Sequence, residues 1–143
     1  MEIISAIYHR EGLEALLETE NLPTKDLPKQ LDNFLVARKT GETIGTIGLE
    51  VYGDRGLLRS LAVAPKFRKQ GVAGKLLAWI EAVAVSQNIG EIYLLTETAT
   101  DYFTSKGYRQ VARPKVPLPV QKSSEFSHVC PQSAIVMKKI LTS

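Results

Sequence analysis

The sequence has 143 residues, of which 44% are hydrophobic and 23% are charged, a balance that is typical of a globular domain and excludes a disordered chain. The net charge of +3 is too small to predict nucleic-acid binding, and the single cysteine excludes an internal disulfide and is compatible with a reducing compartment. Because the sequence shows no run of 18 apolar residues and no signal peptide, we expect one cytoplasmic domain over residues 1–143 that does not cross a membrane.

The first half of the chain predicts strand, helix and three more strands. Residues 3–8 form a short apolar run, and Leu13, Leu16 and Leu17 then recur on one face of a helix. The two prolines of NLPTKDLPKQ end that helix, and a short second helix is considered near residues 26–31. Strands are expected in NFLVARKT, in GETIGTIGLEVYG and in LLRSLAVAP, with a turn at YGDRG.

The second half predicts a long helix followed by alternating elements. Apolar residues recur with helical spacing over residues 71–87, and EIYLLT has the continuous apolar character of a buried strand. A further helix over TATDYFTSKGY is expected to end at Gly107, and YRQVA and AIVMKKIL are expected to be strands. The proline-rich residues 113–133 predict a loop or extension. This order favours a mixed α/β fold with a central sheet flanked by helices.

Residues 57–74 combine a strand, a basic turn with Gly71, and the start of the long helix. Amides at a helix N-terminus bind anions, and Gly71 would let a ligand approach the backbone closely. Arg68, Lys69 and Lys75 would add positive charge. The P-loop pattern and the dinucleotide pattern both fail here, because neither glycine spacing is present. An ordinary helix start with solvated lysines remains the alternative.

Three motifs in order resemble the GCN5-related N-acetyltransferases (GNAT). RKQGVAG matches the R/Q-x-x-G-x-G/A signature, LAVAP resembles the end of the fourth strand, and TATDYFTSKGY resembles a later helical element. The resemblance implies a mixed sheet that splays between its fourth and fifth strands, with acetyl-CoA in the gap. It implies cofactor-binding residues along this segment: Leu61, Ala62 and Val63 for the pantetheine arm, and Arg68, Lys69, Gln70, Gly71, Val72, Ala73 and Gly74 for the pyrophosphate.

A narrower resemblance is carried by LLRSLAVAP, YLLTETATDYF and EFSHVCPQSAIVMKK. These segments are similar to a bacterial acetyltransferase group encoded beside arsenic-resistance genes. A neighbouring gene does not identify a substrate, so arsenic resistance is an expected context and not an activity.

The sequence departs from the family pattern at the position of the general acid. GNAT enzymes often use a tyrosine four residues before the glycine of the last motif, and counting back from Gly107 places Phe103 there. Tyr102 lies one residue earlier, which turns its direction on a helix by about 100°. Either the usual acid is absent or Tyr102 acts from another direction, with a packing role as its alternative. Tyr102 is kept as a candidate catalytic residue and Phe103 as a cofactor-binding residue.

Glu50 and Arg59 flank the YGDR turn. If the hairpin is symmetric about Asp54 and Arg55, the two side chains face each other. Arg59 would then bind a substrate carboxylate, and Glu50 would accept the ammonium proton directly or through water. A structural salt bridge is the alternative. Ser60 is expected on the opposite face of the strand.

Three further residues could have a functional role: Cys130, His128 and Trp79. Cys130 and His128 lack the further ligands of a zinc site, so no metal is expected, and Trp79 fits a sheet edge or a homodimer surface.

We therefore expect an acetyl-CoA-dependent N-acetyltransferase that acts by direct attack on a small-molecule amine, such as an amino acid. A protein acetyltransferase and a non-catalytic CoA-binding sensor are the alternatives. A nucleic-acid partner is not expected, because no aromatic stacking platform is found.

Overall fold

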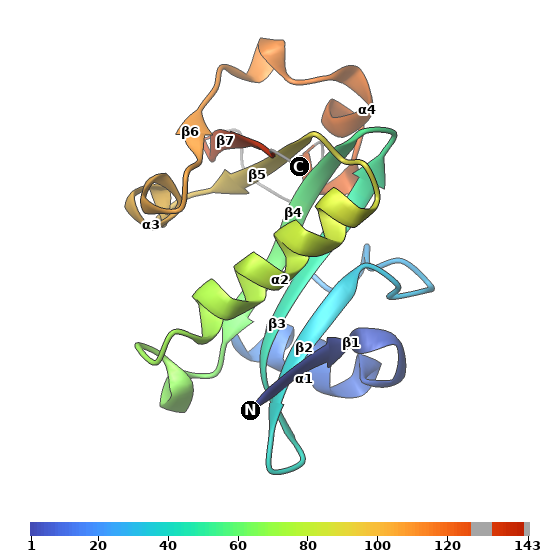
Figure 1. Ribbon diagram of the computed structural model, residues 1–143, viewed down its shortest axis with the longest axis vertical. Coiled ribbons are helices and arrows are strands. Elements are labelled where there is room, and N and C mark those ends of the chain that lie inside the picture. Colours follow the sequence, from blue (N-terminus) through green and yellow to red (C-terminus); the bar gives the residue numbers. More distant parts are fainter. Residues whose placement is uncertain (127–132, 142–143) are drawn as a thin grey trace. The chain divides into compact units, whose positions relative to one another are not determined.

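The computed structural model describes residues 1–126 and 133–141 (Figure 1). Seven strands are hydrogen-bonded in the order β1-β2-β3-β4-β5-β7-β6. The strands are β1 (Glu2–Ser5), β2 (Phe34–Lys39), β3 (Glu42–Tyr52), β4 (Arg55–Val63), β5 (Glu91–Thr96), β6 (Arg109–Gln110) and β7 (Ile135–Ile140). The helices are α1 (Arg10–Thr19), α2 (Val72–Ser86), α3 (Thr100–Ser105) and α4 (Leu118–Gln121). The predicted mixed α/β fold is confirmed.

The chain divides into two compact units, which are described separately. The first unit comprises Met1–Leu49 and Ser60–Val83. Its strands β1 and β2 pair antiparallel, as do β2 and β3, and the side chains of α1 that point inward, among them Leu13 and Leu17, join a core around Phe34.

The head of α2 lies close to β3 within this first unit. A Cβ added to Gly45 would lie 2.9 Å from Leu76 Cδ1 and 3.1 Å from Val72 Cγ1. A contact of 2.9 Å is too short for real carbon atoms, so a larger residue at position 45 would displace the Leu76 side chain, and glycine leaves room for the side chains of the helix against this strand. The start of the long helix is thereby fixed by packing.

The second unit comprises Glu50–Arg59 and Ala84–Ser143. Strands β5 and β7 pair antiparallel over six residues, from Glu91↔Ile140 to Thr96↔Ile135. Strands β4 and β5 are parallel and pair over three residues only, from Arg55↔Glu91 to Leu57↔Tyr93, although both strands continue beyond this ladder. A core cluster of Leu57, Tyr93, Val116, Val120, Phe126 and Val136 holds the segment before α4 and α4 itself against these strands.

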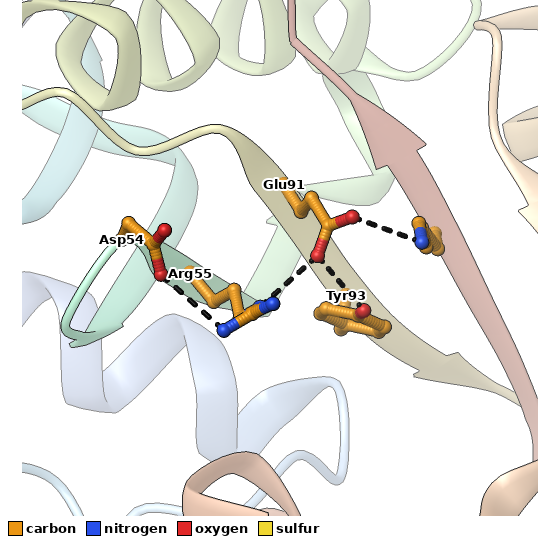
Figure 2. A network of polar contacts seen from close by, with 5 residues as sticks. Asp54, Arg55, Glu91 and Tyr93 are labelled. Carbon is orange, nitrogen blue, oxygen red and sulfur yellow. Dashed lines mark hydrogen bonds and ion pairs between the residues drawn. The ribbon is translucent and has the colours of Figure 1, made fainter. Parts of the chain in front are cut away.

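A network of charged groups lies where the β4–β5 ladder begins (Figure 2). Glu91 Oε1 accepts hydrogen bonds from Arg55 Nε and from the Tyr93 hydroxyl, both at 3.1 Å. Glu91 Oε2 lies 2.9 Å from Lys138 Nζ, and Arg55 Nη1 also lies 3.4 Å from Asp54 Oδ1. Burial alone would raise the pKa of Glu91, but the hydrogen bonds from Lys138, Arg55 and Tyr93 outweigh it and hold this pKa below its ordinary value. The network links three neighbouring strands.

Two local predictions in the first half were wrong. The strand expected over residues 3–8 ends at Ser5, because the Ser5 hydroxyl accepts the amide of Ile7 and starts a 3-10 turn over Ala6–Tyr8. Residues 26–31 form no helix. Their carbonyls at Pro28 and Lys29 instead accept hydrogen bonds from the Arg10 guanidinium at 2.8 and 3.3 Å, and Pro28 has no amide hydrogen to donate.

The segment after β6 contains more structure than the expected loop. It holds a 3-10 turn over Arg113–Lys115 and the short helix α4, and the Gln121 side-chain amide donates to the Val116 carbonyl at 2.7 Å. Prolines stand near the starts of both turns, where a missing amide hydrogen costs nothing. The predictions for Cys130 and His128 fall on residues that lie outside those the structure describes.

Candidate functional site

The turn of residues 68–74, here called the phosphate turn, joins β4 to α2. Pro65 ends the strand with a 3-10 turn over Pro65–Phe67. Two residues then take left-handed backbone conformations, Lys69 with φ of 62° and Gly71 with φ of 81°. Alternation of this kind turns successive amides toward one point, the arrangement that proteins use to bind anions. No atom lies within 4 Å of a Cβ built on Gly71, so the approach to its backbone is open.

The amides of the phosphate turn are not used by the helix. The first backbone hydrogen bond of α2 is donated by Lys75 N–H to the Gly71 carbonyl at 3.1 Å. The amides of Val72, Ala73 and Gly74 therefore precede the helical ladder, at its partially positive end. Lys69 and Lys75 are exposed beside them. This arrangement of backbone donors and cations is suited to a phosphate or pyrophosphate.

Arg68 is held by its own unit. Its Nε donates to the Val63 carbonyl at 3.1 Å, and its guanidinium forms a close ion pair with Glu20, just after α1. These contacts attach the phosphate turn to the end of β4 and to α1. The expected contribution of Arg68 to the cofactor stays a prediction, and its observed contacts are intramolecular.

Strand β4 is irregular where the pantetheine arm is expected. Ser60 has φ of 59°, a left-handed conformation that the sequence did not predict; the face on which its side chain lies stays a prediction. Beyond it, Leu61 and Val63 are partly exposed and Ala62 is 7% exposed. Their roles toward a cofactor remain predictions.

A cluster of polar side chains surrounds the buried Arg59; this Arg59 cluster contains Arg59, Glu50, Tyr52 and Glu125. The Arg59 side chain is 0% exposed; its Nη1 lies 2.7 Å from Glu50 Oε2 and its Nη2 lies 3.8 Å from Glu125 Oε2. The predicted contact between Glu50 and Arg59 is therefore present. The linking residues are Gly53 and Asp54, one position earlier than the symmetric hairpin assumed.

Tyr52 completes the hydrogen bonding of Glu50 in this cluster. The Tyr52 hydroxyl donates to Glu50 Oε1, while Arg59 donates to Oε2. Burial, followed by the hydrogen bond to Glu50, raises the pKa of Tyr52 above its ordinary range, so this phenol remains a donor at neutral pH. Both oxygens of Glu50 are thus oriented, and each retains a lone pair that can accept a further hydrogen.

Glu125 is the member of the cluster that sequence reasoning missed. It follows α4 in a segment that is brought to Arg59 by the packing of Val116, Val120 and Phe126. No spacing or motif links positions 59 and 125. The contact depends on tertiary structure, and only the rule that a buried arginine is paired would have predicted an acidic partner.

Tyr102 and Phe103 on α3 differ in their surroundings. Phe103 is 7% exposed and packs edge-on against Tyr108 at a centroid distance of 5.6 Å. The Tyr102 hydroxyl is buried, and in the described part of the chain it has no hydrogen-bond partner. Burial raises the pKa of Tyr102. An unpartnered buried hydroxyl is unfavourable unless a ligand completes it, which keeps Tyr102 as the candidate acid.

The sequence also raised the questions of a surface tryptophan, a metal site and a membrane span. Trp79 is 56% exposed. Over residues 1–126 and 133–141, no group of three or more His, Cys, Asp or Glu side chains could hold a metal ion. Within the same residues, none of the helices has the length and apolarity needed to cross a membrane.

A family model described as an acetyltransferase (GNAT) domain matches residues 30–110, more than half of the 143 residues. An uncharacterised N-acetyltransferase of Chlorobaculum tepidum is 28% identical over 111 residues, which are 77% of this chain and 68% of that protein.

Solved structures share the fold. The N-acetylglutamate synthase of Neisseria gonorrhoeae, complexed with coenzyme A and N-acetyl-glutamate, matches with a TM-score of 0.81 and 19% identity over 99% of this chain and 35% of that chain. A Mycobacterium tuberculosis protein in complex with CoA matches with a TM-score of 0.81 and 21% identity over 99% and 100% of the two chains. The chain spans about a third of the synthase. By its matched domain and the names of its relatives, this chain belongs to the GNAT acetyltransferase family.

Proposed function

We propose that the chain is an acetyl-CoA-dependent N-acetyltransferase whose acceptor is the amine of a small molecule, such as an amino acid or an analogue of one. The observation that carries this proposal is the phosphate turn, in which amides that precede the helical ladder, two left-handed residues and exposed lysines are suited to bind an anion at the head of α2. Structural neighbours with the same fold were crystallised with coenzyme A, and one of them with N-acetyl-glutamate. These support a CoA ligand and an amino-acid acceptor.

The cofactor assignment follows the chain from β4 into α2. The amides of residues 69–74 bind the pyrophosphate, and the backbone of Leu61, Ala62 and Val63 binds the pantetheine arm. Acetyl-CoA supplies the activated acetyl group. Arg68 contributes by holding the turn through Val63 and Glu20, and Phe103 contributes packing beside the cofactor.

The transfer requires a neutral amine, a polarised thioester carbonyl and a stabilised thiolate. Glu50 accepts the proton of the acceptor ammonium group, directly or through water, with its oxygens oriented by Tyr52 and Arg59. The amine nitrogen then attacks the acetyl carbonyl, the carbon–sulfur bond breaks, and Tyr102 donates its hydroxyl proton to the departing thiolate. The proton that the acylated nitrogen loses returns to Tyr102 through water, and Glu50 releases its proton to solvent. No covalent enzyme intermediate is needed.

Arg59 could bind a carboxylate of the acceptor or orient Glu50, and the contacts of the Arg59 cluster favour the orientation of Glu50. A substrate carboxylate at Arg59 would compete with Glu50 and Glu125 for the same guanidinium. Orientation of Glu50 needs no such exchange. We therefore assign Arg59 first to positioning Glu50, and binding of an acceptor carboxylate is kept as a second role.

Calorimetry with acetyl-CoA, followed by a thiol-release assay over a panel of amino acids and simple amines, tests the proposal. We expect saturable binding and turnover with at least one small amine. Binding without turnover of any amine or peptide would favour the CoA-sensing alternative, and turnover of peptides alone would favour a protein acetyltransferase. A complete lack of binding would contradict the proposal. The narrower resemblance to arsenic-associated acetyltransferases stays a prediction.

A further inference from the structure

Ser60 is an unusual residue of β4. Five residues other than glycine have positive φ in the described part of the chain, and Ser60 alone among them lies inside a strand or helix. A left-handed conformation is unfavourable for a residue with a Cβ. It persists only where surrounding contacts hold it, and such positions cluster at functional sites.

Thr46 supplies a contact that holds this conformation. Its hydroxyl donates to the Ser60 carbonyl at 2.7 Å. Thr46 is 0% exposed and Ser60 is 9% exposed, so water does not compete for this bond and its loss would leave a buried carbonyl without this donor. Thr46 is itself fixed in β3, opposite Val36 of β2. The irregular backbone is therefore tied to the regular interior of the first unit.

The position of Ser60 along the chain gives this bond a functional meaning. Ser60 directly follows Arg59, whose side chain is fully buried, and directly precedes residues 61–63. In a regular strand, successive backbone groups alternate in direction. A left-handed residue breaks that alternation and resets the direction of the amides and carbonyls that follow it, in the manner of a β-bulge.

We propose that Thr46 is a positioning residue for acetyl transfer. Its hydroxyl holds the left-handed backbone at Ser60 and so sets the direction of the hydrogen-bonding groups of residues 61–63 toward the pantetheine arm. This inference rests on the proposed function. Valine has nearly the same shape and is favoured in a buried strand, so replacing Thr46 by valine tests the hydroxyl and not the packing.

The test uses Thr46→Val, which removes the hydroxyl, and Thr46→Ser, which keeps it. We expect Thr46→Val to raise the KM for acetyl-CoA about tenfold, the cost of losing one buried hydrogen bond, with the KM for the acceptor unchanged. Thr46→Ser should restore most of the affinity. Adding Ser60→Gly to Thr46→Val should restore part of it, because glycine adopts positive φ without a side chain to strain.

Two controls separate positioning from general damage. Thr43→Val removes another hydroxyl of β3, which accepts a hydrogen bond from Arg38 at 3.0 Å, and should leave the KM for acetyl-CoA unchanged. Binding of 3′-phospho-ADP, which carries the pyrophosphate but no pantetheine arm, should be equal in the wild type and in Thr46→Val.

The outcomes are distinct. An unchanged KM for acetyl-CoA in Thr46→Val overturns the inference while leaving the proposed function intact. Equal losses of acetyl-CoA and 3′-phospho-ADP binding also overturn it, because they would indicate that the first unit is damaged as a whole. Failure of the wild type to bind acetyl-CoA would instead overturn the proposed function, and this inference with it.

Discussion

The phosphate turn consists mainly of backbone amides, whereas the Arg59 cluster consists of side chains. The turn presents backbone amides at an exposed surface and depends on two left-handed residues within one short segment. The cluster presents side chains from β3, β4 and the segment after α4, and its arginine is fully buried. A backbone site of this kind can be lost through a change of local conformation, whereas a buried ionic site is lost when any one of its charges is removed. The turn should therefore control affinity, and the cluster should control stability as well as chemistry.

The largest effect on the free energy of unfolding is expected when the buried Arg59 is replaced. Arg59→Met leaves the carboxylates of Glu50 and Glu125 close together without their cation, which should lower the free energy of unfolding by about 3–5 kcal/mol. Arg55→Met is the matched control, because the Arg55 side chain is 43% exposed and an exposed ion pair contributes about 0–1 kcal/mol. Urea unfolding of both variants measures the difference. Equal effects would show that burial does not govern the Arg59 cluster.

The second prediction examines the exposed turn. Gly71→Val forces a β-branched residue into positive φ and places a side chain over the amides, so the affinity for acetyl-CoA should fall by about tenfold or more. Gly41→Val is its control: Gly41 has φ of 77°, and no atom lies within 4 Å of its added Cβ, as at Gly71. Both variants should lose similar stability. If calorimetry found the same affinity in both, the turn would not be the pyrophosphate site.

Replacing Tyr102 is expected to have smaller effects, which raise the stability of the protein and lower its kcat. The Tyr102 hydroxyl has no hydrogen-bond partner among the residues that the structure describes, so its removal in Tyr102→Phe should raise the free energy of unfolding by about 1 kcal/mol, since the desolvation cost disappears. The same change should lower kcat about tenfold or more if the hydroxyl protonates the thiolate. Thermal unfolding and steady-state kinetics on one preparation measure both. A kcat equal to that of the wild type would remove Tyr102 from the mechanism.

The smallest effect concerns the partly exposed network of Figure 2. The pKa of Glu91 is held below its ordinary value of 4.5, so its contribution to stability is present above pH 4.5 and is lost as the pH falls through the depressed pKa. Glu91→Gln should destabilise the protein by no more than about 1 kcal/mol at pH 7, with the difference vanishing in acid. Unfolding curves at several pH values test this, with the exposed Glu18→Gln as the control for loss of charge. A difference that persisted in acid would contradict the ionic explanation.

Local sequence was sufficient for the phosphate turn and insufficient for the Arg59 cluster. The spacing of Arg68, Gly71 and Ala73, after a strand and before a strongly periodic helix, predicted the turn, because every group in it belongs to one short segment. The contact between Glu50 and Arg59 was also predictable, since the two residues flank one hairpin. Glu125 was not, because its approach to Arg59 depends on how a distant segment packs.

Backbone irregularities were the other failure of prediction. The strand pattern of β4 gave no sign that Ser60 would be left-handed, since serine has no strong preference for that conformation and its partner Thr46 is fourteen positions away. The helix considered at residues 26–31 failed for a similar reason, because Arg10 binds the carbonyls of that segment. In both places the backbone accepts a hydrogen bond from a side chain distant in sequence.

Trp79 gives the protein a built-in optical probe. It is the only tryptophan of the chain, its side chain is 56% exposed, and it lies about two turns along α2 from Val72. Its emission therefore comes from a single, solvent-accessible indole on the helix that begins at the phosphate turn. Quenching of that emission by acrylamide, with and without nucleotide, would follow occupancy on the unlabelled protein.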